Sequence, residues 1–358
     1  MKNKTTLTFP KIASQNHPLA SGKLLQKTSD KLLNPDQMDF KIAREIVAVH
    51  KKISKKTTAD GEWSWINDKL KKIYIDALNN EDVKLIAKIL ANMFRDEITY
   101  GLISSSYRDL DSLKGRKGLE NHILLDLDAW HEFADQNRGG IKNLDTPRVG
   151  NSYGLMIEPN ILISVDNPRH DYFALKLIRL GLSLKKDKFT LLEIGGGYGG
   201  LCYQIFRRTK KVRYINVDLP ESLYLAYYFL RKSMPKKQIK WVFDGLTENN
   251  LKEGSIFFVP AQTAKKITCK VDVVFNCHSL SEMSKKAVNG YMQMIDRWSP
   301  LFFLHQNSNF LLFPKSLRHI EVLASDFRLT KYREIYKAVS IWQGAGGRYR
   351  EYLFKLKP

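Results

Sequence analysis

Glycines cluster directly after a short apolar run in the second half of the chain, and an acid stands just before them. The run Phe189–Ile194 predicts a buried strand, which stops at the segment Glu193-Ile-Gly-Gly-Gly-Tyr-Gly199. Glycine lets a chain turn tightly, and it lets a ligand approach the backbone where any other residue would place a Cβ atom. We therefore expect a nucleotide-binding turn between a strand and a helix, formed by Glu193, Gly195, Gly196, Gly197 and Gly199.

A second acid, Asp218, ends the next predicted strand, Val212–Asp218. A carboxylate at that position can accept hydrogen bonds from ribose hydroxyls. The glycines also satisfy the dinucleotide fingerprint Gly195-x-Gly197-x-x-Gly200, so the turn and Asp218 fit both NAD and S-adenosylmethionine. Glu193 favours S-adenosylmethionine, because an acid just before the glycines suits a cationic ligand with an amino acid head group and suits a pyrophosphate poorly.

Histidines follow two further predicted strands, at the edge where a doubly wound sheet binds its ligands. His278 follows the strand Val271–Asn276, and His305 follows the strand Leu301–Leu304. A hydroxyl group that accepts a methyl group needs a general base to remove its proton. Imidazole can act as a general base near neutral pH. We expect His278 to be the base, oriented by Glu282 four residues later, with His305 as the second candidate.

The segment before the first strand offers further polar side chains. His170 stands near the start of a predicted helix that opens with Asn167-Pro168, and it is a third candidate for the base. Arg169 beside it suits a phosphate or an acidic sugar. The residues that we expect to contact the substrate are Tyr153, Arg169, His170, Tyr172 and Asn307.

Disulfide and zinc chemistry are not indicated. The cysteines are odd in number and lack metal-type spacing, which fits a reducing, cytoplasmic compartment: Cys202, Cys269 and Cys277. We expect no metal, although His278 and Glu282 with Asp272 or Asp244 leave a Mg²⁺ ion open as an alternative.

Strands and helices alternate from about residue 150 onward, which predicts a parallel sheet with helices on both faces. Two closing strands, Leu329–Val339 and Tyr349–Leu356, follow five strand–helix units, as they do in class I methyltransferases. The pattern predicts an α/β, Rossmann-like domain over residues 151–358.

The first 150 residues carry a helical pattern instead. Apolar residues recur at helical spacing over about 38–56, 63–78, 81–99 and 119–133, which predicts an N-terminal helical domain. Residues 1 to about 35 show no period and predict a flexible arm. The turn-rich tract 139–154 is expected to link the two parts. The helices would cover the substrate site or form a homodimer contact, and the residues do not choose between these roles.

The composition is that of a globular protein with a basic surface. The 358 residues include 58 Lys and Arg against 37 Asp and Glu, a net charge of +21, which attracts anionic substrates. The lysines are scattered and no zinc-finger or basic-zipper pattern is present, so nucleic acid is not an expected partner. The sequence lacks any apolar run of eighteen residues, so we expect no membrane span, while peripheral membrane association stays open.

Four segments between about residues 150 and 310 resemble a family of sugar O-methyltransferases from bacterial surface-polysaccharide gene clusters. They are Leu192–Leu201, Val217–Glu221 with Leu225–Leu230, Phe275–Met283 and Gln306–Asn309. The resemblance implies methyl transfer from S-adenosylmethionine to a sugar hydroxyl of a glycan or of a nucleotide- or lipid-linked sugar. It also implies cofactor contacts at Asp218, Leu219, Gln262 and Asn276.

Two other functions stay open on the sequence alone. An NAD-dependent sugar oxidoreductase or epimerase would share the glycine turn, but its epimerase branch would need a Tyr-x-x-x-Lys pair. Position 340, four residues after Tyr336, is a serine. The other alternative is a non-catalytic methyltransferase fold that only binds, and the intact Glu193, glycines and Asp218 argue against it.

Overall fold

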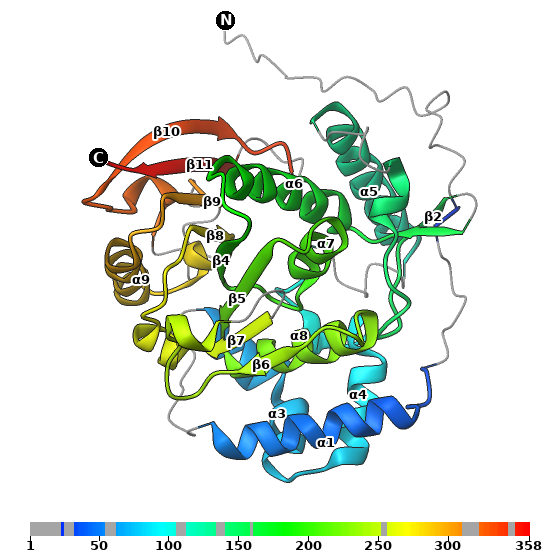
Figure 1. The fold of residues 1–358 in the computed structure, drawn as a ribbon. Coiled ribbons are helices and arrows are strands. Elements are labelled where there is room, and N and C mark those ends of the chain that lie inside the picture. Colours follow the sequence, from blue (N-terminus) through cyan, green and yellow to red (C-terminus); the bar gives the residue numbers. More distant parts are fainter. Residues whose placement is uncertain are drawn as a thin grey trace, which may run out of the picture.

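The computed structural model describes residues 23–24, 32–53, 62–104, 112–133, 140–157, 160–251, 256–309, 322–342 and 348–358. An eight-stranded sheet crosses the molecule, with helices packed on both of its faces (Figure 1). Its strands are β4 (Phe189–Ile194), β5 (Val212–Asp218), β6 (Ile239–Trp241), β7 (Ile256–Pro260), β8 (Val273–Cys277), β9 (Phe302–Ser308), β10 (Tyr332–Val339) and β11 (Tyr349–Leu356).

The strand order is β10-β11-β9-β8-β4-β5-β7-β6, and the strands from β6 to β9 run parallel. Strand β11 lies antiparallel between β9 and β10. The chain leaves β4 toward β5 on one side and later returns to β8 on the other side. This reversal is a topological switch point, where sheets of this kind bind ligands beyond the carboxyl ends of their strands. The predicted Rossmann-like α/β architecture is confirmed.

Both faces of the sheet are covered at its centre, where all six residues of β4 are buried and point alternately to either side. Leu191 belongs to the cluster that contains the apolar faces of α6 (Asn167–Ser183), α7 (Gly200–Arg208) and α8 (Pro220–Ser233). Leu192 belongs to a second cluster on the opposite face, with α9 (Lys285–Trp298).

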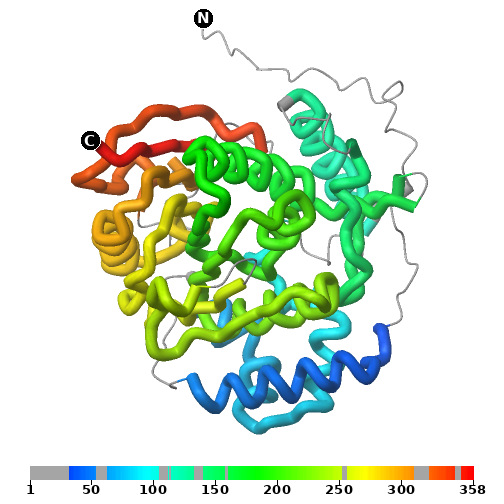
Figure 2. The backbone as a smooth tube through the Cα atoms, viewed as in Figure 1, coloured from blue at the N-terminus to red at the C-terminus, as the bar shows by residue number. Residues whose placement is uncertain are grey.

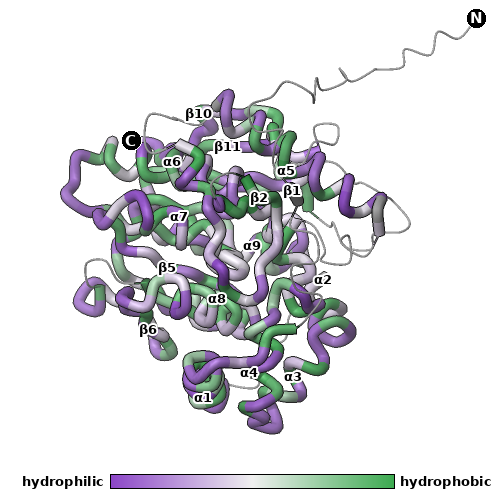
Figure 3. Tube along the Cα trace, turned by 90° about the vertical axis from the view of Figure 1, so that its right-hand side faces the viewer, coloured by the Kyte–Doolittle hydropathy of each residue, from purple (hydrophilic) through white to green (hydrophobic). Residues whose placement is uncertain are grey.

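The N-terminal helices are α1 (Gln37–Lys52), α2 (Glu62–Trp65), α3 (Lys72–Asn79), α4 (Val83–Ala91) and α5 (Leu113–Phe133). A capping box between Asp36 and Asp39 begins α1. Hydrophilic and hydrophobic residues alternate along α1 (Figure 3), and its apolar side packs against α4 and α8. Figure 2 shows α1, α3 and α4 in blue and cyan at the bottom of the view, and one core cluster contains residues from Ile42 to Leu353.

Several predicted boundaries differ from the structure. The helix predicted over 63–78 is interrupted by a π-helical turn, Ile66–Leu70, and the one predicted over 81–99 ends at Ala91 and continues in short 3₁₀ turns. Apolar spacing alone does not reveal such changes of helical pitch. A small sheet of β1 (Lys23–Leu24), β2 (Leu155–Ile157) and β3 (Ile161–Ile163) was not predicted. The rest of the predicted arm, up to residue 31, lies outside the described residues.

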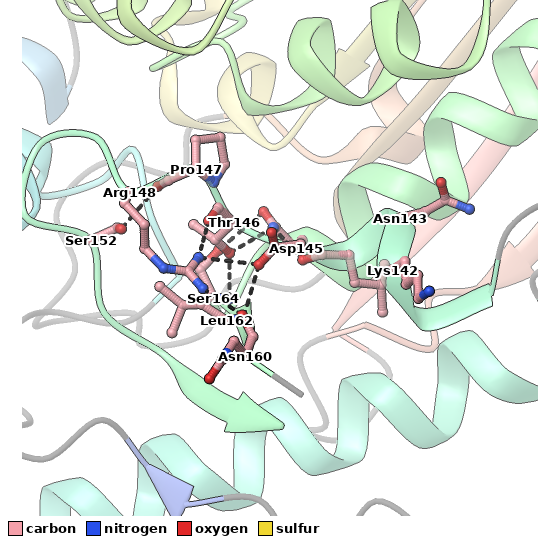
Figure 4. A network of polar contacts seen from close by, with 12 residues as sticks. Lys142, Asn143, Asp145, Thr146, Pro147, Arg148, Ser152, Asn160, Leu162 and Ser164 are labelled. Atoms are coloured by element: carbon pink, nitrogen blue, oxygen red, sulfur yellow. Dashed lines mark hydrogen bonds and ion pairs between the residues drawn. The ribbon is translucent and has the colours of Figure 1, made fainter. Parts of the chain in front are cut away.

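Hydrogen bonds hold the turn-rich tract that was predicted to link the two parts of the chain (Figure 4). The Thr146 backbone N–H donates to the Leu162 carbonyl (2.7 Å), and the Leu162 N–H donates to Asp145 Oδ1 (2.9 Å). Arg148 Nη2 donates to the Asn160 carbonyl (2.9 Å). From the other side, Arg207 on α7 donates to three backbone carbonyls of the tract. The described part of the connector, from residue 140, is therefore fixed to both β3 and α7.

Candidate active site

A cavity of about 480 Å³ opens at the carboxyl ends of β4, β5, β7 and β8, within the size range of small-molecule sites. The glycine turn between β4 and α7 forms its floor. Of the predicted cofactor residues, the following line it: Glu193, Gly195, Gly196, Gly197, Asp218, Leu219 and Gln262.

The glycine turn needs glycine for two separate reasons. Gly195, Gly197 and Gly199 have φ angles of +73°, +55° and +87°, a region that other residues rarely adopt. A Cβ atom on Gly195 would lie 2.0 Å from Ser279 Oγ, and one on Gly196 would lie 2.6 Å from Glu193 Oε2. The backbone of the turn is therefore packed directly against the side chains of Ser279 and Glu193, which leave no room for a Cβ atom. Gly199 itself begins α7 as the residue before its first turn.

Two carboxyl groups flank this turn, one buried and one half-buried. Glu193 is 4% exposed and accepts a hydrogen bond from the Tyr214 hydroxyl, and burial raises its pKa to about 8. Asp218 accepts hydrogen bonds from the backbone N–H groups of Gly197 (2.8 Å) and Leu219 (2.7 Å). Burial raises the pKa of Asp218 to about 6, against the effect of these two hydrogen bonds. A cation, or a pair of hydroxyl donors, would stabilise the ionised form of either acid.

The N-terminal helical segment contributes two residues to this site that the sequence analysis did not identify. Trp63, on α2, lines the cavity, and its Nε1 donates to Glu282 Oε2 (3.1 Å). Lys71 follows the π-helical turn, is fully buried, and places its Nζ 4.6 Å from the centre of the Trp63 ring. Burial lowers the pKa of Lys71 to about 8, and the carboxyl groups of Glu221 and Asp218 oppose that shift.

Two predicted contact residues, Asn276 and Asn307, are buried beneath the cavity and do not line it. Asn276 Nδ2 donates to the Ile194 carbonyl (2.8 Å) and to Ser279 Oγ (2.6 Å), directly under the glycine turn. Asn307 Nδ2 donates to Asn276 Oδ1 (2.7 Å), and its own oxygen accepts from the backbone N–H of Ser281 (3.1 Å). Both asparagines therefore link β8, β9 and the glycine turn through hydrogen bonds.

His278 lines the cavity in a strained backbone conformation, with a φ angle of +69°. Its ring lies against Tyr349, 4.4 Å between ring centres, and its Nε2 is 2.7 Å from Gln306 Nε2. Burial, with smaller effects of Arg169 and His170, holds the pKa of His278 well below its ordinary value, so the ring is neutral at pH 7. The hydrogen-bond partner of the ring is Gln306, and Glu282, predicted as the orienting residue, accepts a hydrogen bond from Trp63.

His305, the second predicted base, lies away from the cavity. It is fully buried in β9 among four aromatic rings, of Phe303, Phe327, Tyr352 and Phe354. Burial lowers its pKa to about 3. A ring enclosed in this way cannot reach a substrate in the cavity, so this position does not fit a base.

The predicted substrate residues are divided between the cavity and its surroundings. Arg169 and His170 line the cavity, and burial lowers the pKa of His170 to about 4. Tyr172 points elsewhere, with its hydroxyl donating to Glu351 Oε2 (3.2 Å). Tyr153 lies in a separate small cavity, with the Arg95 guanidinium 5.2 Å from its ring centre.

Neither a metal-binding cluster nor a membrane-crossing helix occurs in the part of the chain that the structure describes. Within these residues, no group of three His, Cys, Asp or Glu side chains is placed to hold a metal ion. None of the described helices combines the length and the apolar character that crossing a bilayer requires.

No protein-family model matches the sequence, and no match to a curated protein was found. Solved structures with a similar fold include an S-adenosylmethionine-dependent methyltransferase from Clostridium acetobutylicum ATCC 824, with 12% identity and a TM-score of 0.37 over 52% of this chain and 91% of that one. Another is magnesium protoporphyrin IX methyltransferase (ChlM) from Synechocystis PCC 6803 with bound SAM, with 13% identity and a TM-score of 0.34 over 54% and 81%.

The small RNA methyltransferase HEN1 is also similar, with 15% identity and a TM-score of 0.36 over 53% of this chain. This chain spans 25% of the length of that protein. None of the three names a sugar substrate, and identities and TM-scores this low say nothing about which acceptor this chain uses.

Proposed function

We propose that the chain is an S-adenosylmethionine-dependent methyltransferase. The observation that carries this proposal is the pairing of two acids, the buried Glu193 and the half-buried Asp218, on either side of a glycine turn in one cavity. An adenosine with a sulfonium and an amino group offers both hydroxyl donors and positive charge. A dinucleotide would instead bring a pyrophosphate toward Glu193, and its negative charge would oppose the ionisation of that acid instead of stabilising it.

Unsatisfied polar groups around the turn fit such a ligand. The side chain of Asn216, beside Glu193 in the sheet, is fully buried, and neither its oxygen nor its nitrogen has a hydrogen-bond partner. Gly197 lines the cavity, and the atom nearest to an added Cβ there is 3.6 Å away, so a ligand can approach this part of the turn. Asp218 would accept hydrogen bonds from the ribose, Leu219 and Gln262 would flank the adenine, and Glu193 would face the amino group.

The bound cofactor supplies an already activated methyl group, so the remaining task is to hold the acceptor in line and remove its proton. As the acceptor we propose a sugar hydroxyl, on the strength of the four resembling segments. His278 is the residue for the proton, because it lines the cavity and is neutral at pH 7.

Gln306 decides which nitrogen of His278 can accept that proton. The Oε1 atom of Gln306 is buried and has no hydrogen-bond partner, while its Nε2 lies 2.7 Å from His278 Nε2. Turning the amide over would let Oε1 accept a hydrogen bond from an Nε2–H, which satisfies that oxygen. Nδ1 would then carry the free lone pair and act as the base.

The cofactor proposal is tested by titrating purified full-length protein with S-adenosylmethionine, S-adenosylhomocysteine and NAD⁺ in a calorimeter. We expect binding of the first two, loss of that binding in Asp218→Ala, and no loss in Asp244→Ala, which removes an exposed acid. Recovery of NAD(H) from the purified protein, together with no S-adenosylmethionine binding, would refute the proposal and favour the oxidoreductase alternative.

The acceptor proposal needs a separate assay with a labelled methyl donor. Nucleotide sugars and polysaccharide fragments are compared with small RNA, since one of the similar structures is named as a small RNA methyltransferase. Label transferred to sugars alone supports the proposal. Label transferred to RNA alone would keep the methyltransferase and reject the sugar.

A further inference from the structure

Arg169 holds two buried hydrogen-bond donors without an acceptor at the wall of the cavity. Its side chain is 8% exposed, and its Nη2 donates to Asp166 Oδ1 (2.7 Å). Its Nε and Nη1 atoms are buried and have no hydrogen-bond partner. A buried donor without a partner loses its hydrogen bonds to water and gains none in return, so a ligand that supplied oxygen atoms here would recover that free energy.

Arg169 supplies the permanent positive charge of the cavity wall. Among the described residues that line the cavity, it is the only lysine or arginine. Its partner Asp166 also accepts hydrogen bonds from Ser104, at Oγ (2.5 Å) and at the backbone N–H (3.2 Å). Arg169 lies in the first turn of the 17-residue helix α6, whose positive end adds to the attraction for an anion.

Arg169 lies at the end of the cavity beside β8, which we assign to the methyl acceptor. The helix α6 packs against β8, with the rings of Phe173 and Phe275 4.9 Å apart, whereas Asp218 lies at the end of β5, beyond β4. We propose that Arg169 and the first turn of α6 bind an anionic oxygen group, a phosphate or a carboxylate, carried by the methyl acceptor. This inference rests on the proposed function, and it narrows the acceptor to a negatively charged molecule.

The test uses the full chain saturated with S-adenosylhomocysteine, so that any group of the cofactor that could occupy the arginine is already in place. Inorganic phosphate and acetate are titrated separately into this complex by calorimetry. We expect at least one of them to bind, and Arg169→Gln to weaken that binding by about tenfold or more, as the loss of a charge-assisted pair implies. The tighter of the two anions identifies the acceptor as phosphorylated or as carboxylated.

Two further variants show whether a loss of anion binding results from a folding defect. Arg169→Lys keeps the charge that faces Asp166 but loses the planar fork, so it should fold and bind the anion more weakly than wild type. Arg179→Gln removes an exposed arginine from the same helix and should leave anion binding unchanged.

Three results would overturn the inference. Neither anion binds the saturated protein, or the anion binds wild type and both Arg169 variants equally well. The third is that Arg169→Gln and Arg169→Lys weaken S-adenosylhomocysteine itself while the anion competes with it, which would assign the guanidinium to the cofactor. A protein that binds no S-adenosylhomocysteine at all would instead refute the proposed function, so the two failures are distinguishable.

Discussion

Replacing single glycines of the turn by alanine separates two effects, the strain of a positive φ angle and the steric overlap of an added Cβ atom. At Gly195 a Cβ atom meets Ser279 Oγ at 2.0 Å and the backbone has a φ of +73°. At Gly197 the φ is +55°, but the nearest atom, Leu102 Cδ2, is 3.6 Å away. Gly290, within α9, has no atom within 4 Å of an added Cβ and serves as the control.

The expected free energies follow from these distances and angles. Gly197→Ala carries only the left-handed strain, about 1–2 kcal/mol. Gly195→Ala adds an overlap with a packed side chain, which brings its total to about 2–5 kcal/mol. Gly290→Ala removes a glycine from a helix and should stabilise the protein by about 0.5–1 kcal/mol.

Urea unfolding measures the three free energies, and calorimetry measures S-adenosylmethionine affinity on the same samples. We expect affinity to fall most in Gly195→Ala, because relief of the overlap must move Ser279 and with it the hydrogen bond from Asn276. The double variant Gly195→Ala with Ser279→Gly should recover part of the loss, since the two residues are in contact. Equal effects of Gly195→Ala and Gly197→Ala, or no recovery in the double variant, would refute the steric reasoning.

Three further predictions concern titration and catalysis. Burial raises the pKa of Glu193 to about 8, and a cationic ligand favours its ionised form, so S-adenosylmethionine affinity should rise up to about tenfold per pH unit below pH 8 and then level off. Calorimetry from pH 6 to 9 should show that rise in wild type and not in Glu193→Gln, and a flat wild-type profile would contradict it. Lys71→Met removes the buried ammonium that favours ionised Asp218. The affinity for S-adenosylmethionine near pH 6 should therefore fall by about tenfold, with a smaller loss at pH 8. An unchanged pH profile of this affinity would show that Lys71 does not stabilise ionised Asp218. His278→Ala should lower kcat by about 10²–10⁴ with unchanged cofactor affinity, and Gln306→Glu should raise the pKa of His278 and move the pH optimum upward. Full turnover in His278→Ala would remove this residue from the mechanism.

Local sequence was enough to predict the cofactor half of the site. A strand that ends in glycines and continues into a helix is defined by residues that are neighbours along the chain. The positive φ angles at Gly195, Gly197 and Gly199 are a local demand that only glycine meets without strain. Asp218 was predicted from its position at the end of the next strand, because parallel strands end at a common edge of the sheet.

Contacts between distant segments could not be predicted in this way. Glu282 and His278 are four residues apart, yet the hydrogen bonds of this region join Glu282 to Trp63 and His278 to Gln306. The 3₁₀ turn that follows β8 does not place residues i and i+4 as an α-helix does. His305 has a suitable type and position in the chain, but the sheet turns it into an aromatic cluster.

The amino-acid sequence by itself predicted the class of sheet, the glycine turn and the two acids beside it, because strand burial and backbone φ are set by residues close to one another along the chain. Only the tertiary structure decided which polar groups meet in the cavity. It brought Trp63 into the cavity lining and Lys71 beside it, left Arg169 with unpaired donors in the cavity wall, and buried His305 away from the cavity. Burial and pairing depend on segments 100 or more residues apart, such as Trp63 and Glu282, for which no periodicity carries a signal.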